Sequence, residues 1–109
     1  MEAKRENSNI VLYLHMNDLD VGVYNIKQLL RDFGAKTGDL LQKTPGGYPV
    51  EKMVSVYNAL DGLVNCTIQE GLSWTPLEAM ACGTPVIASD TTSQTELVMG
   101  AAEMVPCND

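Results

Sequence analysis

The sequence of 109 residues predicts an α/β fold in which a parallel sheet carries helices on both faces, as in Rossmann-like domains. Short apolar runs rich in β-branched residues alternate with segments whose apolar residues recur at helical spacing. Parallel strands need crossover connections, so this alternation favours parallel pairing. A hydrophobic content of 45% with only 19% charged residues indicates a packed core, and the length fits a single domain spanning residues 1–109.

Five short apolar segments are expected to be strands, and they are residues 10–14, 40–41, 63–66, 85–88 and 103–105. The first is continuously apolar, which is typical of a strand buried on both faces of a parallel sheet. We expect one sheet of at least four parallel strands, in which residues 10–14, 63–66 and 86–88 all take part.

Four helices are expected between these strands, over residues 24–33, 49–60, 76–82 and 93–100, the first starting at Tyr24. Gly34 and Gly83 follow two of them, at the position where a left-handed residue commonly ends a helix. Pro49 suits the first position of the second helix, since the N–H that proline lacks has no partner there.

The last two helices carry start signals of another kind. Ser93 and Glu96 have the spacing of a capping box, and so do Thr75 and Glu78, with Pro76 at the first helical position. A capping role would by itself explain Glu78.

The net charge of −7, from 14 acidic and 7 basic residues, opposes nucleic acids and anionic membranes, so no nucleic-acid partner is expected. The first apolar run is too brief for a transmembrane segment. Cys66, Cys82 and Cys107 are spaced too widely for a zinc site and are expected to be free, mostly buried thiols. We therefore expect a cytoplasmic protein without a metal ion or cofactor.

Residues 70–90 carry most of the functional information. In open parallel sheets, ligands bind beyond the carboxyl ends of the strands, which points to the loops after residues 66 and 88. Residues 70–75 lead into a helix, whose first N–H groups and dipole can hold a diphosphate. Glu70 and Glu78 are separated by seven residues, and each could accept hydrogen bonds from sugar hydroxyls.

This segment resembles the C-terminal domain of the group-one glycosyltransferases, which are retaining enzymes of the two-domain GT-B architecture. The shared pattern is a Glu-Gly start at Glu70, a second glutamate at Glu78, and then Ala-Met-Ala-Cys-Gly-Thr-Pro-Val-Ile-Ala. Milder resemblance extends over residues 50–61 and 96–106. The resemblance implies a partial GT-B C-terminal domain over residues 10–109.

The resemblance also implies roles for individual residues. Glu70 would be the catalytic-site residue that contacts hydroxyls of the donor sugar, and Glu78 would bind the ribose hydroxyls of the nucleotide. The amides of the intervening loop would hold the diphosphate and sugar, and they belong to Gly71, Leu72, Ser73, Trp74 and Thr75. The implied donor substrate is a nucleotide-diphosphate sugar, transferred with retention and without a metal.

Two parts of the family pattern have no counterpart. The family's domain begins with a further strand and a loop whose Arg and Lys neutralise the diphosphate, and nothing before Ile10 matches them. The acceptor-binding N-terminal domain has no match either. We therefore expect the chain to be incomplete on its own, with a separate acceptor-binding domain or a homo-oligomer as partner. The alternatives are a non-catalytic nucleotide-sugar-binding module and a remnant that oligomerises.

Simpler explanations exist for several of these residues. Glu70 could be a solvated loop carboxylate, and Trp74 is expected to be a packed aromatic. His15 ends the first expected strand without a paired Asp, Cys or Ser, so it is left out of the site. Cys82 is expected to belong to the core.

Overall fold

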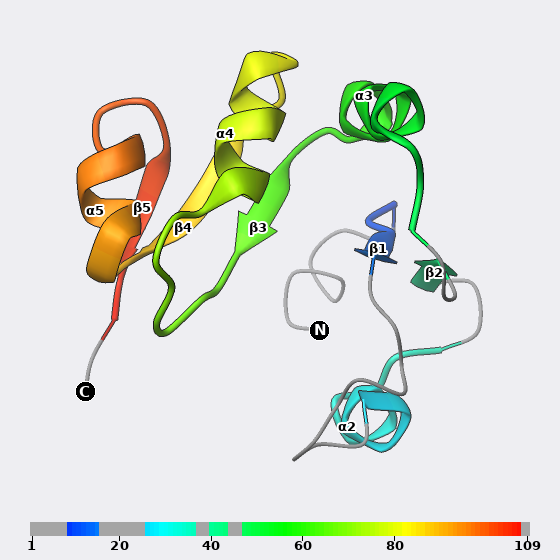
Figure 1. Ribbon diagram of the computed structural model, residues 1–109. Coiled ribbons are helices and arrows are strands. Elements are labelled where there is room, and N and C mark those ends of the chain that lie inside the picture. Colours follow the sequence, from blue (N-terminus) through cyan, green and yellow to red (C-terminus); the bar gives the residue numbers. More distant parts are fainter. Residues whose placement is uncertain (1–8, 16–25, 37–39, 44–46, 108–109) are drawn as a thin grey trace. The chain divides into compact units, whose positions relative to one another are not determined.

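The computed structural model describes residues 9–15, 26–36, 40–43 and 47–107. The chain divides into two compact units, Met1–Gly47 and Tyr48–Asp109, and each is described by itself (Figure 1). None of the helices in the described ranges has the length and apolar character that crossing a bilayer requires.

The described residues of the first unit form a parallel pair of strands and one helix. Strand β1 (Leu12–His15) is followed by helix α2 (Ile26–Asp32) and strand β2 (Leu40–Lys43), and β1 pairs with β2 in parallel. The strand expected at residues 40–41 is confirmed and continues further. Tyr24, the expected start of the helix, lies outside the described residues.

Two expectations for this unit have different outcomes. Gly34 ends α2 as predicted, with a φ of 78° and an N–H bond of 2.9 Å to the carbonyl of Arg31. The first unit by itself does not bury the first strand on both faces, as Val11 is 50% exposed and Leu12 is 37% exposed. Within this unit the strand lies in a two-stranded sheet, which has too little surface to bury an apolar strand on both sides.

The second unit contains a three-stranded parallel sheet in the order β3-β4-β5 (Figure 1). Its strands are β3 (Leu63–Asn65), β4 (Val86–Asp90) and β5 (Glu103–Pro106). Helices α3 (Val50–Ala59), α4 (Trp74–Ala81) and α5 (Thr92–Val98) each precede one of these strands. The α/β fold class with parallel strands and intervening helices is therefore confirmed.

Strand pairing is defined within each unit. β1 pairs with β2 in the first unit, and β3, β4 and β5 form the sheet of the second unit. Residues 63–66 and 86–88 share one parallel sheet as expected, whereas a sheet that also includes residues 10–14 would span both units and stays a prediction. Alternation of strands and helices predicts that strands run parallel, but packing between distant segments decides which strands become neighbours.

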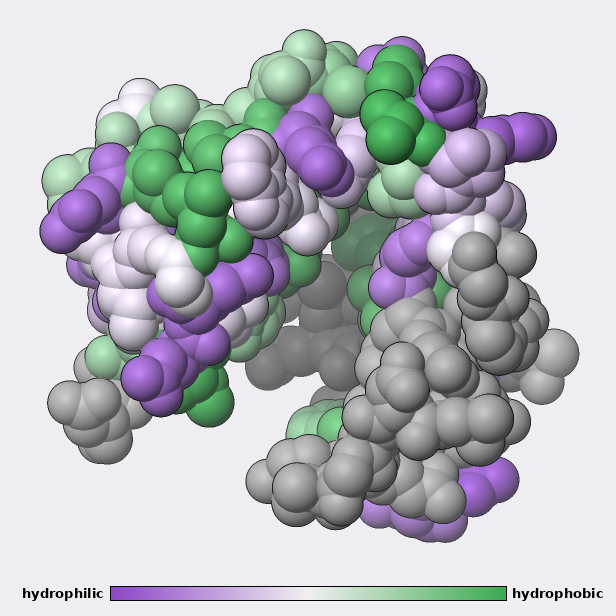
Figure 2. All heavy atoms as spheres, in the orientation of Figure 1, coloured by the Kyte–Doolittle hydropathy of each residue, from purple (hydrophilic) through white to green (hydrophobic). Residues whose placement is uncertain are grey.

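Helices α4 and α5 pack on one face of the three-stranded sheet. The buried core joins Val86 and Ala88, which alternate along β4, with Ala79 of α4 and Val98 of α5. The apolar residues of the opposite face are exposed, and they include Val64, Ile87 and Val105. Figure 2 shows one face of the molecule, where apolar and hydrophilic side chains lie side by side.

Helix α4 begins two residues earlier than predicted. Its first residue is Trp74 and its N-cap is Ser73, whose side chain makes no capping bond. Thr75 therefore lies inside the first turn, and the capping box expected from Thr75 and Glu78 is wrong. Pro76 is tolerated as the third residue, because the first N–H groups of a helix have no partner within it. Helix capping consequently does not explain Glu78.

Helix α5 also starts early. Its N-cap is Thr91, again without a side-chain capping bond, so the capping box expected from Ser93 and Glu96 is wrong. The Ser93 hydroxyl donates instead to the carbonyl of Glu70, 3.2 Å away. The local pattern predicts that the Ser93 hydroxyl caps the helix, but in the structure it bonds to a residue distant in sequence.

The remaining helix signals are confirmed or shifted by one residue. Gly83 has a φ of 78°, its N–H bonds to Met80, and the Thr84 N–H bonds to the carbonyl of Ala79, each at 2.9 Å. This pair of bonds closes α4 in a Schellman motif. Pro49 is the N-cap of α3 and not its first helical residue.

The cysteines are less buried than predicted. Cys82 is half-buried and packs against the core, as expected, but Cys66 and Cys107 are exposed. Cys66 follows β3 on the same side as the exposed Val64, since side chains alternate along a strand.

Candidate functional site

The candidate site lies where β3 and β4 end. Their parallel pairing puts both carboxyl ends at one edge of the sheet. Residues 66–73, called the Glu70 loop below, leave this edge toward α4, and residues 89–94 leave it toward α5 (Figure 1). Ligands of open parallel sheets bind at this edge.

Hydroxyl side chains from residues 89–93 hold the backbone of the Glu70 loop. Three of them donate to loop carbonyls: Ser89 to Thr67 at 2.6 Å, Thr91 to Ile68 at 3.1 Å, and Ser93 to Glu70 at 3.2 Å. Thr92, between two of these donors, has a φ of 47°, which a β-branched residue rarely adopts. The loop that carries Glu70 is therefore bonded at three points, once to the end of β4 and twice to the start of α5.

Gln94 reinforces this connection from inside the unit. Its side chain is fully buried, accepts a 3.2 Å bond from the Asn65 amide, and donates to Ser89 at 3.3 Å and to the Thr67 carbonyl at 3.5 Å. A buried amide is retained only where its polar atoms are bonded. Gln94 thus joins β3, β4 and the Glu70 loop.

We expect Gln94→Leu to lower the free energy of unfolding by about 1–3 kcal/mol, because it removes these bonds at similar volume and leaves Asn65 without its acceptor. Urea unfolding measures the change. Gln28→Leu is the matched control, since Gln28 lies exposed on α2, and its effect should stay within about 0.5 kcal/mol. Equal effects of the two substitutions would contradict the role given to Gln94.

Glu70 is half-buried and held in place. The hydroxyl of the fully buried Ser73 donates to Glu70 Oε2, and Glu70 also accepts the bond from Ser93 through its carbonyl. The simple explanation of Glu70 as a freely solvated carboxylate is therefore wrong. Its other carboxylate oxygen is the group that could accept hydrogen bonds from a ligand.

The loop amides are available in part. The Trp74 N–H donates to the carbonyl of Leu72 at 3.1 Å, so it already has a partner. Pro76, two residues further along α4, has no N–H to offer a ligand. The Trp74 side chain is 63% exposed, so its expected role as a packed aromatic is wrong. It lies on the first turn of α4, whose inner side is already filled by the buried Ser73 and Pro76.

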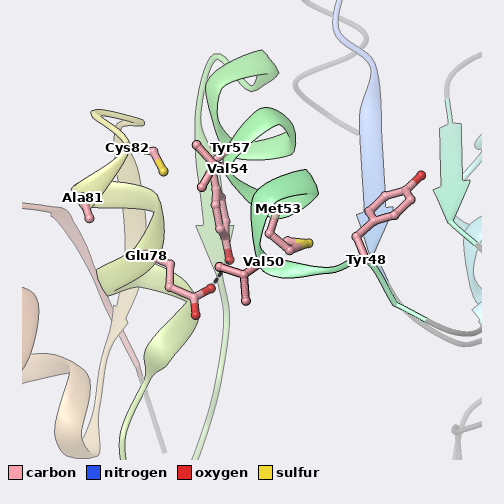
Figure 3. Close-up of a pocket in the computed structure, with 8 residues that line it drawn as sticks. All are labelled: Tyr48, Val50, Met53, Val54, Tyr57, Glu78, Ala81 and Cys82. Carbon is pink, nitrogen blue, oxygen red and sulfur yellow. Dashed lines mark hydrogen bonds between the residues drawn. The ribbon is translucent and has the colours of Figure 1, made fainter.

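Glu78 opens onto a pocket between α3 and α4 of about 240 Å³ (Figure 3). Apolar side chains form most of its wall, and the lining residues are Tyr48, Val50, Met53, Val54, Tyr57, Glu78, Ala81 and Cys82. The Tyr57 hydroxyl donates a 2.8 Å bond to Glu78 Oε2. Figure 3 shows this bond crossing from α3 to α4. The pocket therefore combines apolar walls with one oriented carboxylate.

Tyr57 keeps its proton unusually firmly. Burial, and next the hydrogen bond and negative charge of Glu78, raise the pKa of Tyr57 from its ordinary value near 10 to about 12. At neutral pH the hydroxyl is a donor, which leaves the Glu78 carboxylate as the acceptor of this pair.

This shift predicts a loss of stability at alkaline pH. The unfolded chain releases the Tyr57 proton near pH 10, whereas the folded chain keeps it to about 12, so the stabilisation is complete below pH 10 and lost as the pH rises from 10 to 12. We expect wild type to lose more stability than Tyr57→Phe across this window. Denaturant unfolding at pH 9, 10, 11 and 12 tests it, and parallel curves for the two proteins would contradict it.

The structure places Glu70 and Glu78 in different local surroundings. Glu70 is bonded through Ser73 and the start of α5, whereas Glu78 is bonded to α3. Sequence reasoning did not identify Tyr57 or Gln94 as residues of the site. The cluster of hydroxyl residues over 89–93, directly after an expected strand, was an available signal, because ligands and binding loops gather at the carboxyl ends of parallel strands.

Among the residues that the structure describes, no three His, Cys, Asp or Glu side chains lie close enough together to hold a metal ion.

The basic residues are distributed unevenly along the sequence. Residues 48–109 contain eight acidic residues and one basic residue, Lys52, so they carry the whole net charge of the chain. An anionic ligand of this unit would depend on backbone N–H groups.

The fold and this site define a parallel α/β unit whose two glutamates flank the entry into one helix. The family model described as glycosyl transferases group 1 matches residues 39–109, more than half of the chain, and the chain belongs to this family. The chain is a glycosyltransferase family member, and the resemblance that its sequence indicated is confirmed at this level.

One curated relative is 51% identical over 47 residues, the lipopolysaccharide core biosynthesis mannosyltransferase LpsB of Rhizobium meliloti (strain 1021). The match covers 43% of this chain and 13% of that relative. No solved structure matches the chain significantly.

Proposed function

We propose that this chain forms the donor-binding part of a retaining GT-B glycosyltransferase and binds a nucleoside-diphosphate hexose. The observation that supports this most is the Glu78 carboxylate, which lines an apolar pocket and is bonded there by the Tyr57 hydroxyl. Family membership supports glycosyl transfer as the chemistry. The match to a mannosyltransferase makes a mannose or other hexose donor the first to test.

Glu78 is proposed to bind the ribose. A carboxylate has about four lone-pair directions, so the bond from Tyr57 leaves capacity for the two neighbouring hydroxyls of a ribose. The apolar wall beside it, formed by Val50, Met53 and Val54 of α3, suits the face of a nucleobase. Capping, the simpler explanation of Glu78, is excluded by the start of α4 at Trp74.

Glu70 is proposed to contact the hydroxyls of the donor sugar at the catalytic site. Ser73 orients its carboxylate, and three bonds to its loop keep the backbone in place. Such preorganisation lets a group act on a substrate without rearranging first. The diphosphate would lie against the amides of Gly71, Leu72, Ser73 and Thr75, at the positive end of the α4 dipole.

Transfer needs cations that residues 48–109 do not supply. The diphosphate leaving group gains negative charge during transfer, and Lys52 is the one basic residue of this unit. Losing one electrostatic contact of this kind costs roughly 3–4 kcal/mol in an active site. We therefore propose that these cations are the Arg and Lys of the family's first loop, which have no counterpart before Ile10, and that the chain alone binds the donor without transferring sugar. The same observation favours the alternative of a non-catalytic binding module.

Calorimetric titration tests the proposal. The ligands are UDP, GDP and ADP with their glucose and mannose conjugates, each with and without EDTA, followed by assays with sugar acceptors. We expect at least one nucleoside diphosphate and its conjugate to bind equally well with EDTA, and no sugar to be transferred. Absence of all nucleotide binding would overturn the proposal, and clear turnover would show that the chain is catalytically complete. A cytoplasmic location is part of the proposal and is testable by cell fractionation.

A further inference from the structure

We propose that Tyr57 is a positioning residue for the donor site, which holds the Glu78 carboxylate in the orientation that binds the two ribose hydroxyls. The inference rests on the proposed function of Glu78. It assigns a binding role to a residue that lies on a different helix and is almost wholly buried.

The contact itself is well suited to orienting a carboxylate. Tyr57 is 4% exposed, and its hydroxyl reaches across from α3 to Glu78 Oε2 at 2.8 Å. Glu78 is exposed, so its flexible side chain would otherwise sample several rotamers. Figure 3 shows the Tyr57 ring lying along the pocket with its hydroxyl directed at the carboxylate.

Tyr57 is fixed at its other end as well. The buried Thr84 hydroxyl donates to the Tyr57 carbonyl at 2.8 Å, and the Leu60 N–H bonds to the same carbonyl at 3.1 Å. Thr84 also belongs to the turn that closes α4, through its N–H bond to Ala79. Residue 57 thus contacts the middle of α4 through its hydroxyl, at Glu78, and the turn that follows α4 through its carbonyl, at Thr84.

Holding the Glu78 carboxylate in one orientation lowers the entropic cost of ligand binding. A carboxylate that is already oriented loses less side-chain entropy when a ligand binds than a mobile one does. Each ribose hydroxyl can then donate to a carboxylate oxygen of Glu78 at a defined position. Removal of the Tyr57 hydroxyl should therefore weaken only the interactions that Glu78 makes with the ligand.

The test compares Tyr57→Phe with wild type in calorimetric titrations of GDP, UDP and ADP, each paired with its 2′,3′-dideoxy analogue. Phenylalanine keeps the ring in the core and removes only the hydroxyl. We expect about five- to tenfold weaker binding of the ribonucleotide, and a change of less than about twofold for the dideoxy analogue. In a Glu78→Gln background, Tyr57→Phe should weaken binding much less than it does in wild type.

Tyr13→Phe is the matched control, because its hydroxyl bonds to His15 in the other compact unit, and it should leave both affinities unchanged. Binding of the dideoxy analogue reports that each variant is folded. If wild type prefers the ribonucleotide but Tyr57→Phe weakens both ligands alike, or neither, the positioning role is overturned while the proposed function stands. If wild type binds both ligands equally, or neither, the ribose role of Glu78 fails and the inference fails with it.

Discussion

Glu78→Gln is expected to weaken the binding of nucleoside diphosphates by about tenfold or more. A hydrogen bond to a charged acceptor contributes roughly 1.5–3 kcal/mol, and the substitution replaces the carboxylate by an amide of the same reach. The Tyr57 hydroxyl can still donate to the amide oxygen, and α4 does not depend on Glu78 for capping. Thermal stability should therefore change little.

Calorimetric titration with UDP, GDP and ADP measures this effect, with thermal melts in parallel. Glu51→Gln is the control, since it removes the same charge from an exposed position on α3 outside the pocket lining. Its affinities should match those of wild type. A strong drop in melting temperature with unchanged affinity would show that Glu78 supports the fold and not the ligand.

Glu70→Gln is expected to separate the sugar from the nucleotide. It should weaken the binding of a nucleotide sugar by about tenfold or more, since a charged acceptor of the sugar hydroxyls is lost, and leave the bare nucleoside diphosphate nearly unchanged. The amide oxygen can still accept the bond from Ser73, and the three bonds to the loop carbonyls involve no part of this side chain.

The measurement compares each nucleoside diphosphate with its glucose and mannose conjugates in wild type, Glu70→Gln and the Glu51→Gln control. The decisive quantity is the ratio of the two affinities in each protein. If Glu70→Gln weakens both ligands by the same factor, Glu70 acts on the diphosphate or on the loop, and the proposed sugar contact is wrong.

The location of the candidate site is predictable from the sequence alone. Strands alternating with helices indicate parallel pairing, and the two glutamates lie beyond the carboxyl end of an expected strand. The structure confirms the parallel pairing of β3 and β4 and the loop position of Glu70. The ligand roles of Glu70 and Glu78 remain predictions.

Helix starts show where local patterns fail. Both expected capping boxes were wrong, because α4 and α5 begin at Trp74 and Thr92. Ser93 has the spacing of a cap, yet its hydroxyl bonds to the Glu70 carbonyl on another segment. A hydroxyl near a helix start takes whichever partner the packed chain brings closest, and spacing along the chain contains no information about that partner.

The sequence by itself determined the family, the α/β class and the order of the elements, because these depend on periodicity and on a contiguous motif read along the chain. Only the tertiary structure decided the order of the strands within the second unit, the bonds by which Gln94 and the hydroxyls of residues 89–93 hold the Glu70 loop, and the bond between Tyr57 and Glu78. Tyr57 and Glu78 are 21 positions apart, and Gln94 and Thr67 are 27 apart. Such contacts form through packing between segments distant in sequence, so no local pattern can predict them.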